Sequence, residues 1–197
     1  RRQIIENCIS AKINFIDSAA AYGAAEKAVG IATEGIRDKF YLATKVRIEG
    51  KEAGERQIVQ SFENFNTGYI DLLQIHNMID YQTHLPTLER LQDEGKIGMI
   101  GVTAMVVEAY PAIMDLMRFG RIDTVQIPYN VVQREVEAEL LPLAEELGSV
   151  IDQLADSSLL SGDEARRLAR VGLANYFAGA ALMPYGAFLA AAQEARH

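Results

Sequence analysis

The chain has a single cysteine, Cys8, and too few basic residues to balance its acidic ones. One cysteine cannot form a disulfide within the chain, which is typical of a reducing compartment, so we expect a cytoplasmic protein. Lys and Arg number 19 against 27 Asp and Glu, giving a formal net charge of −8. A field of this sign repels phosphate backbones and anionic lipid headgroups. We therefore expect no nucleic acid and no membrane surface as partners.

An uncharged run over residues 171–192 has the length of a membrane span. Gly179, Pro184 and Gly186 interrupt the run, and Asn175 adds a polar group to it. Proline and glycine disrupt helices, and polar groups are costly in hydrocarbon. We therefore predict two packed helices joined near Pro184 rather than a membrane helix.

Residues 1–148 alternate short apolar runs with amphipathic stretches of helical period. The short runs, such as "YIDLLQIH", are nearly apolar throughout, which favours parallel strands buried on both faces of the sheet. This α/β pattern leaves two architectures, an open doubly wound sheet or a closed (β/α)₈ barrel. The predicted strands are 13–17, 40–46, 69–76, 97–103, 123–128 and, with a weaker pattern, 149–154; the predicted helices are 1–11, 24–34, 53–66, 85–94, 107–118 and 135–147.

The alternation ends at Gly148, which we interpret as the C-cap of the last of these helices. The remaining sequence is rich in alanine and has a helical pattern. We predict two domains, an α/β domain over residues 1–150 and an Ala-rich helical tail over residues 151–197.

Ionisable side chains stand at the ends of three successive predicted strands, where Asp17 ends the first, Lys45 the second and His76 the third. Tyr22 follows Asp17 in the same loop. Ligands bind at this carboxyl edge of the sheet in parallel α/β folds. Each of the four residues alone also has an ordinary structural explanation, such as helix capping. Together the four suit carbonyl reduction, because a cation held by a carboxylate makes a tyrosine hydroxyl a usable proton donor.

Five segments of the chain resemble the aldo-keto reductase family in order and spacing: "INFIDSAAAYGAAEKAVGIA", "FYLATKV", "GYIDLLQIHN", "LERLQDEGKIGMIGVT" and "IDTVQIPYNVVQREVEAELLPLAEELG". The resemblance covers roughly residues 1–149. It implies that Asp17, Tyr22, Lys45 and His76 match the family's catalytic tetrad. In that match Tyr22 is the general acid, Lys45 and Asp17 lower its pKa, and His76 orients the substrate carbonyl.

The resemblance also implies a nicotinamide cofactor, usually NADPH, bound without a Rossmann fold. In keeping with this, no Gly-x-Gly-x-x-Gly motif follows a predicted strand. Gln126 matches the glutamine that contacts the nicotinamide amide. Thr103 keeps the hydroxyl of the family's Ser-Asn pair, and Ala104 loses its amide. No segment resembles the family's basic phosphate-binding loop.

The fold that the resemblance implies is a partial (β/α)₈ TIM barrel. About six of the eight βα units are found, because the family's first strand would precede residue 1 and nothing resembles the eighth. The sequence also begins with Arg1 rather than Met, so we expect a fragment of a longer chain.

Residues 165–195 are similar to a segment of ImmA/IrrE-like domains, which in the active peptidases follows a His-Glu-x-x-His zinc motif. That motif is lacking here, and the chain has three histidines, His76, His84 and His197. We therefore expect no metal, and a hybrid reading frame would explain both resemblances.

Our leading functional hypothesis is NADPH-dependent reduction of a small-molecule aldehyde or ketone. The alternatives are a non-catalytic barrel remnant that binds a nucleotide or a partner protein, and an inactive chimeric fragment. Substrate identity and oligomeric state are left open by the sequence.

Overall fold

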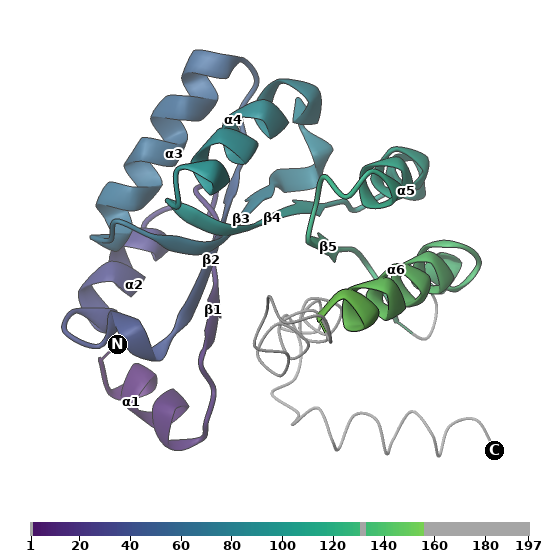
Figure 1. Cartoon of the computed structure of the whole chain (residues 1–197). Helices are drawn as coiled ribbons and strands as arrows, with labels where there is room; N and C mark the ends of the chain where they lie inside the picture. The colour runs from purple at the N-terminus through teal and green to yellow at the C-terminus, as the bar shows by residue number, and fades with distance from the viewer. Residues whose placement is uncertain (1, 131–132, 156–197) are drawn as a thin grey trace. The chain divides into compact units, whose positions relative to one another are not determined.

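The computed structural model of the chain describes residues 2–130 and 133–155 (Figure 1). The chain divides into two compact units, Arg1–Val125 and Gln126–His197, which we describe separately. Most of the predicted tail (residues 156–197), with the helices expected around Pro184 and the ImmA/IrrE-like segment, lies outside the described residues. These features remain predictions, as does the domain boundary at residue 150.

The described strands form one sheet in which neighbours in sequence are neighbours in space, in the order β1-β2-β3-β4-β5. The first four pair in parallel. A doubly wound sheet reverses its strand order at a switch point, whereas a barrel adds each new strand on the same side. The sequential order therefore confirms the α/β partial barrel. The strands are β1 (Phe15–Asp17), β2 (Tyr41–Val46), β3 (Ile70–Ile75), β4 (Ile97–Thr103) and β5 (Thr124–Gln126).

Helices connect these parallel strands, as the geometry of a parallel crossover requires. Figure 1 shows α2, α3 and α4 along the same side of the sheet; α3 packs against β2, and α4 packs against β3 and β4. The helices of the first unit are α1 (Arg2–Ser10), α2 (Ala25–Thr33), α3 (Lys51–Phe65), α4 (Tyr81–Asp93) and α5 (Tyr110–Arg118), with short 3₁₀ turns η1 (Arg37–Lys39), η2 (His76–Met78) and η3 (Val107–Ala109). The second unit contains η4 (Glu135–Glu137) and α6 (Leu140–Ala155).

The core of the first unit is built from the central strands, which are buried along nearly their whole length. Consecutive buried residues place apolar side chains on both faces of the sheet, as the nearly apolar strand sequences predicted. Core side chains that are at most 2% exposed include Leu42, Leu73, Ile75, Ile100 and Val102.

Several boundaries differ from the sequence prediction by a few residues, and two differences change the assignment of a residue. The predicted strand at residues 149–154 is helical and belongs to α6, and Gly148 lies inside that helix instead of ending it. A glycine inside a helix costs about 1 kcal/mol relative to alanine, so it weakens a helix without having to terminate it. The helix predicted from residue 85 begins at Tyr81, which places Pro86 inside α4.

Among the described residues, no helix is long and apolar enough to cross a membrane. No group of three or more His, Cys, Asp or Glu side chains in this part of the chain could hold a metal ion.

Candidate active site

The carboxyl ends of β1, β2 and β3 bring together the ionisable residues singled out in the sequence. Asp17 is the last residue of β1, Lys45 stands one residue before the end of β2, and His76 follows β3 directly. Tyr22 lies in the loop between β1 and α2. The strands run parallel with Asp17 beside Ala43, so their ends share one edge of the sheet.

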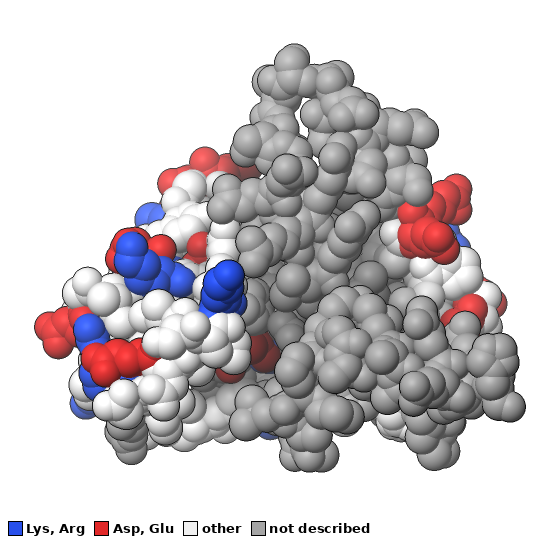
Figure 2. Space-filling model, turned by 90° about the horizontal axis from the view of Figure 1, so that it is seen from below, with Lys and Arg blue, Asp and Glu red and all other residues white. Residues whose placement is uncertain are grey.

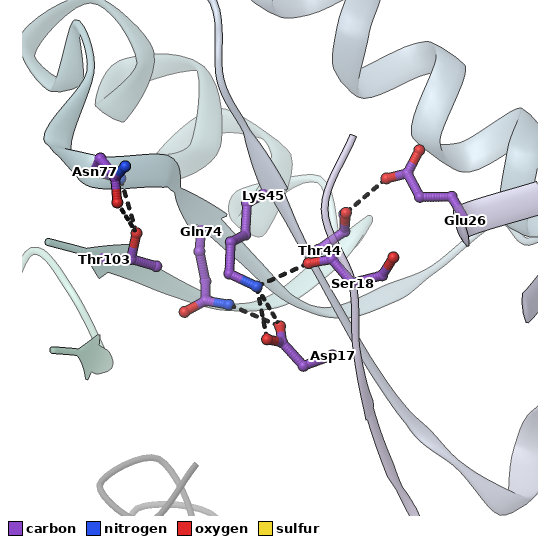
Figure 3. Close-up of polar contacts among 8 residues, drawn as sticks. All are labelled: Asp17, Ser18, Glu26, Thr44, Lys45, Gln74, Asn77 and Thr103. Atoms are coloured by element: carbon purple, nitrogen blue, oxygen red, sulfur yellow. Dashed lines mark hydrogen bonds and ion pairs between the residues drawn. The ribbon is translucent and has the colours of Figure 1, made fainter. Parts of the chain in front are cut away.

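Lys45 and Asp17 form an ion pair at this edge in which the lysine is buried and the carboxylate is partly exposed (Figure 3). Lys45 Nζ lies 2.7 Å from Asp17 Oδ1, 2.6 Å from Oδ2 and 2.8 Å from the carbonyl oxygen of Ser18. The lysine side chain is 2% exposed. Burial lowers the pKa of Lys45 below its ordinary value, while the charge of Asp17 and its hydrogen bond oppose that shift. The cation therefore depends on one carboxylate.

Gln74 completes the surroundings of the carboxylate. Its Nε2 donates to Asp17 Oδ1 at 3.2 Å, and the side chain is buried. Gln74 is the register partner of Lys45 on the neighbouring strand, so the two side chains point to the same face. Gln74 was not among the residues predicted for the site, although a polar residue two positions before His76 in a largely apolar strand was a usable signal.

Tyr22 lies beside both the cation and the histidine. Lys45 Nζ is 5.5 Å from the centroid of the Tyr22 ring, within range of a cation–π interaction. The rings of Tyr22 and His76 meet edge to face, with centroids 6.1 Å apart. The tyrosine is 52% exposed, so a ligand entering from solvent could reach it. All four residues of the predicted tetrad are therefore neighbours.

His76 is held neutral by its surroundings. Burial lowers its pKa below the ordinary value, and the positive charges of Lys45 and Arg47 lower it further. The ring nitrogen Nδ1 is buried and has no hydrogen-bond partner among the described residues. A neutral imidazole carries one N–H, which suits donation of a hydrogen bond to an uncharged carbonyl oxygen.

The two residues predicted to contact a cofactor have different surroundings. Thr103 ends β4 and is buried; its Oγ1 accepts from the backbone N–H of Asn77 at 2.8 Å and donates to Asn77 Oδ1 at 3.3 Å. Gln126 ends β5 and is the first residue of the second unit, so we describe no contact between it and the tetrad.

Glu26 is a buried carboxylate that the sequence did not point out. It is 2% exposed, and it accepts hydrogen bonds from Thr44 Oγ1 at 2.6 Å and from Asn64 Nδ2 at 3.0 Å. These contacts join α2 to β2 and α3. An acidic residue in the first turn of a helix is ordinarily a solvated partner of the helix dipole, which is why the pattern gave no signal.

The described part of the face seen in Figure 2 carries basic and acidic side chains interspersed with each other. No continuous basic patch is seen on this described surface, in keeping with the acidic composition of the chain.

A family model described as the aldo/keto reductase family matches residues 1–162. The aldo-keto reductase YhdN of Bacillus subtilis is 34% identical over an alignment of 162 positions, which covers 73% of this chain and 48% of that protein. The crystal structure of an aldo/keto reductase from Klebsiella pneumoniae in complex with NADP and acetate superposes with a TM-score of 0.61 at 30% identity, over 74% of this chain and 55% of that one.

A third similarity is short. A stretch of 48 residues, 24% of this chain, is 52% identical to 10% of the propionyl-CoA carboxylase regulator of Cereibacter sphaeroides. The chain spans about half the length of the reductases it matches.

Proposed function

Because the chain belongs to the aldo/keto reductase family, we propose that it carries the site of an oxidoreductase that reduces an aldehyde or a ketone to an alcohol with NADPH. The observation that carries the proposal is the ion pair of buried Lys45 with Asp17 beside the Tyr22 ring, together with the edge-to-face contact between that ring and His76.

Tyr22 acts in this proposal as the general acid. A phenol is a weak acid, with a pKa near 10, but a neighbouring cation stabilises the phenolate left after proton donation. Lys45 is that cation, and Asp17 keeps it charged in spite of its burial. Tyr22 thus donates the proton that the carbonyl oxygen needs, and the ion pair compensates the charge left on the tyrosine.

His76 orients the substrate. Its lowered pKa keeps the imidazole neutral near pH 7, so it can donate a hydrogen bond without adding a second cation next to Lys45. The edge-to-face contact with Tyr22 brings the two proposed donors close together, so that one carbonyl oxygen can accept from both.

The donor groups fit the nicotinamide half of the cofactor, which supplies the hydride when it is bound. Thr103 stands at the same edge of the sheet as the tetrad, and one lone pair of its hydroxyl is left after the two hydrogen bonds to Asn77. A neutral hydroxyl suits an uncharged carboxamide. Thr103 is therefore a residue that would hold the nicotinamide, and Gln126 is proposed for the same cofactor from the sequence match to the family alone.

The test is turnover of a panel of aldehydes and ketones by the 197-residue chain, followed by NADPH absorbance. We expect Tyr22→Phe to lower kcat by at least about a hundredfold, the lower range of general-acid contributions, with NADPH affinity nearly unchanged because one hydroxyl is lost. Tyr69→Phe is the matched control, since Tyr69 is 42% exposed and precedes β3 at the opposite edge of the sheet. Turnover by Tyr22→Phe at the wild-type rate would remove Tyr22 from the reaction.

A further inference from the structure

The backbone that follows β3 is strained at the point where it presents His76. Asn77, Met78 and Asp80 all have positive φ, at 54°, 56° and 47°. This left-handed conformation costs a non-glycine residue roughly 1 kcal/mol or more, and it persists where surrounding contacts enforce it. The position of His76 therefore depends on contacts that hold this turn.

A buried pair of hydrogen bonds supplies such contacts. The hydroxyl of Thr103 on β4 accepts from the Asn77 backbone N–H at 2.8 Å and donates to the Asn77 Oδ1 at 3.3 Å. Figure 3 shows the two side chains facing each other across the end of the sheet. Thr103 is 4% exposed, so water does not readily replace these bonds.

The imidazole itself has little else to orient it. Its Nδ1 is buried without a hydrogen-bond partner in the described part of the chain, although such a bond is the usual means of fixing a histidine ring. The ring makes an edge-to-face contact with Tyr22, and the turn η2 on which it is mounted packs against β4.

We propose that Thr103 is a positioning residue that acts through Asn77: the Thr103–Asn77 pair holds the strained turn after β3 and so sets the His76 ring against Tyr22. This inference rests on the proposed function for its effect on turnover. It also changes the main role of Thr103, because the hydroxyl hydrogen is directed to Asn77 and is not available to a carboxamide oxygen.

The decisive measurement is made by NMR on the 197-residue chain and requires no activity. Thr103→Val keeps the shape of the side chain and removes both hydrogen bonds, whereas Thr103→Ser keeps the hydroxyl. We expect Thr103→Val to speed exchange of the Asn77 amide hydrogen about tenfold or more and to shift the His76 ring signals, and Thr103→Ser to restore both.

Thr33→Val is the matched control, because Thr33 is an equally buried threonine whose hydroxyl bonds within α2 to the carbonyl of Val29. It should leave the Asn77 amide and the His76 ring unchanged. Wild-type exchange of Asn77 and unmoved His76 signals in Thr103→Val would overturn the proposal.

Kinetics separate positioning from cofactor contact. A misplaced His76 lowers kcat, so Thr103→Val should reduce kcat about tenfold or more, and by a larger factor than it raises the Kd for NADPH. A Kd that rises by a larger factor than kcat falls, with normal exchange at Asn77, would make cofactor contact the main role of Thr103 and contradict the inference. If the wild-type chain reduces no carbonyl, the proposed function fails. Hydrogen exchange at the Asn77 amide and the NMR signals of the His76 ring then test by themselves whether the Thr103–Asn77 pair positions His76.

Discussion

Lys45 is the residue on which the candidate site most depends, because its charge is buried and has one carboxylate to balance it. Breaking a buried pair leaves an uncompensated charge, which typically costs about 3–5 kcal/mol. The pair thus couples the stability of the fold to the chemistry of the site.

We expect Asp17→Asn to lower the free energy of unfolding by about 1–3 kcal/mol near pH 7, measured by urea denaturation, which is less than for a fully buried pair because the Asp17 side chain is 24% exposed. The pKa of Lys45 is lowered in the folded protein, so between that pKa and the ordinary value the unfolded chain binds more protons and stability rises with pH. Removal of Asp17 takes away the influences that raise the pKa, so the deficit should shrink as the pH rises and Lys45 becomes neutral.

The control for this substitution is Asp115→Asn, which removes an exposed partner of Arg118. Exposed ion pairs contribute little to stability, so Asp115→Asn should change the free energy of unfolding by less than about 0.5 kcal/mol. This change should not vary with pH over the range in which Lys45 loses its proton. Equal effects of the two substitutions on the free energy of unfolding would mean that Asp17 does not stabilise the charged form of Lys45.

At the scale of elements, Glu26 joins α2 to β2 and α3 through two buried hydrogen bonds. The same helix pair approaches closely at Gly30, where a side chain would collide with the carbonyl oxygen of Asn64. Because α2 follows the loop that carries Tyr22, this junction fixes one end of that loop.

Glu26→Ala should lower the free energy of unfolding by about 2–4 kcal/mol, because it leaves the Thr44 hydroxyl and the Asn64 amide unsatisfied and opens a cavity. Glu26→Gln keeps the shape and one acceptor, so it should cost less than half as much. Thermal and urea denaturation of the two variants supply the comparison, and an Ala variant as stable as the Gln variant would show that the hydrogen bonds contribute nothing.

The elements also show which features the sequence could predict. The strand ends were predictable, because apolar runs that stop at Asp17, Lys45 and His76 mark where buried β structure meets the ligand-binding edge. The α6 error has a physical cause: residues 149–154 are apolar enough for either a strand or a helix, and the continuing helical period over Gly148 decided the outcome.

The missed contacts are of a different kind. Glu26 contacts Thr44, which is 18 positions away in the sequence, and Asn77 contacts Thr103, which is 26 positions away. Such pairs depend on how neighbouring strands and helices are placed in space, and no local periodicity reports that placement.

For the whole molecule, the charge balance bears on cofactor choice. The net charge of −8 opposes a polyanionic dinucleotide, and no segment of the sequence resembles the family's basic phosphate-binding loop. The loss of two charge-assisted phosphate contacts, each contributing roughly 1.5–3 kcal/mol, weakens binding by at least about a hundredfold.

We therefore expect the 197-residue chain to bind NADPH and NADH with Kd values within about tenfold of each other, measured by calorimetric titration at fixed salt concentration. Strong preference for NADPH would contradict this and indicate a phosphate site that the sequence analysis did not recognise. Arg166, Arg167 and Arg170, which lie outside the described residues, would then be the first positions to substitute with glutamine.

The position of Asp17 on β1 has a consequence for how the protein would lose activity. Within the described sheet β1 is an outer strand of three residues, and the preceding helix α1 has no buried residue. Segments with few buried contacts open with a smaller free energy than the core. The carboxylate that supports Lys45 therefore lies on an outer strand that opens more easily than the central strands, so inactivation on heating would precede melting of β2, β3 and β4.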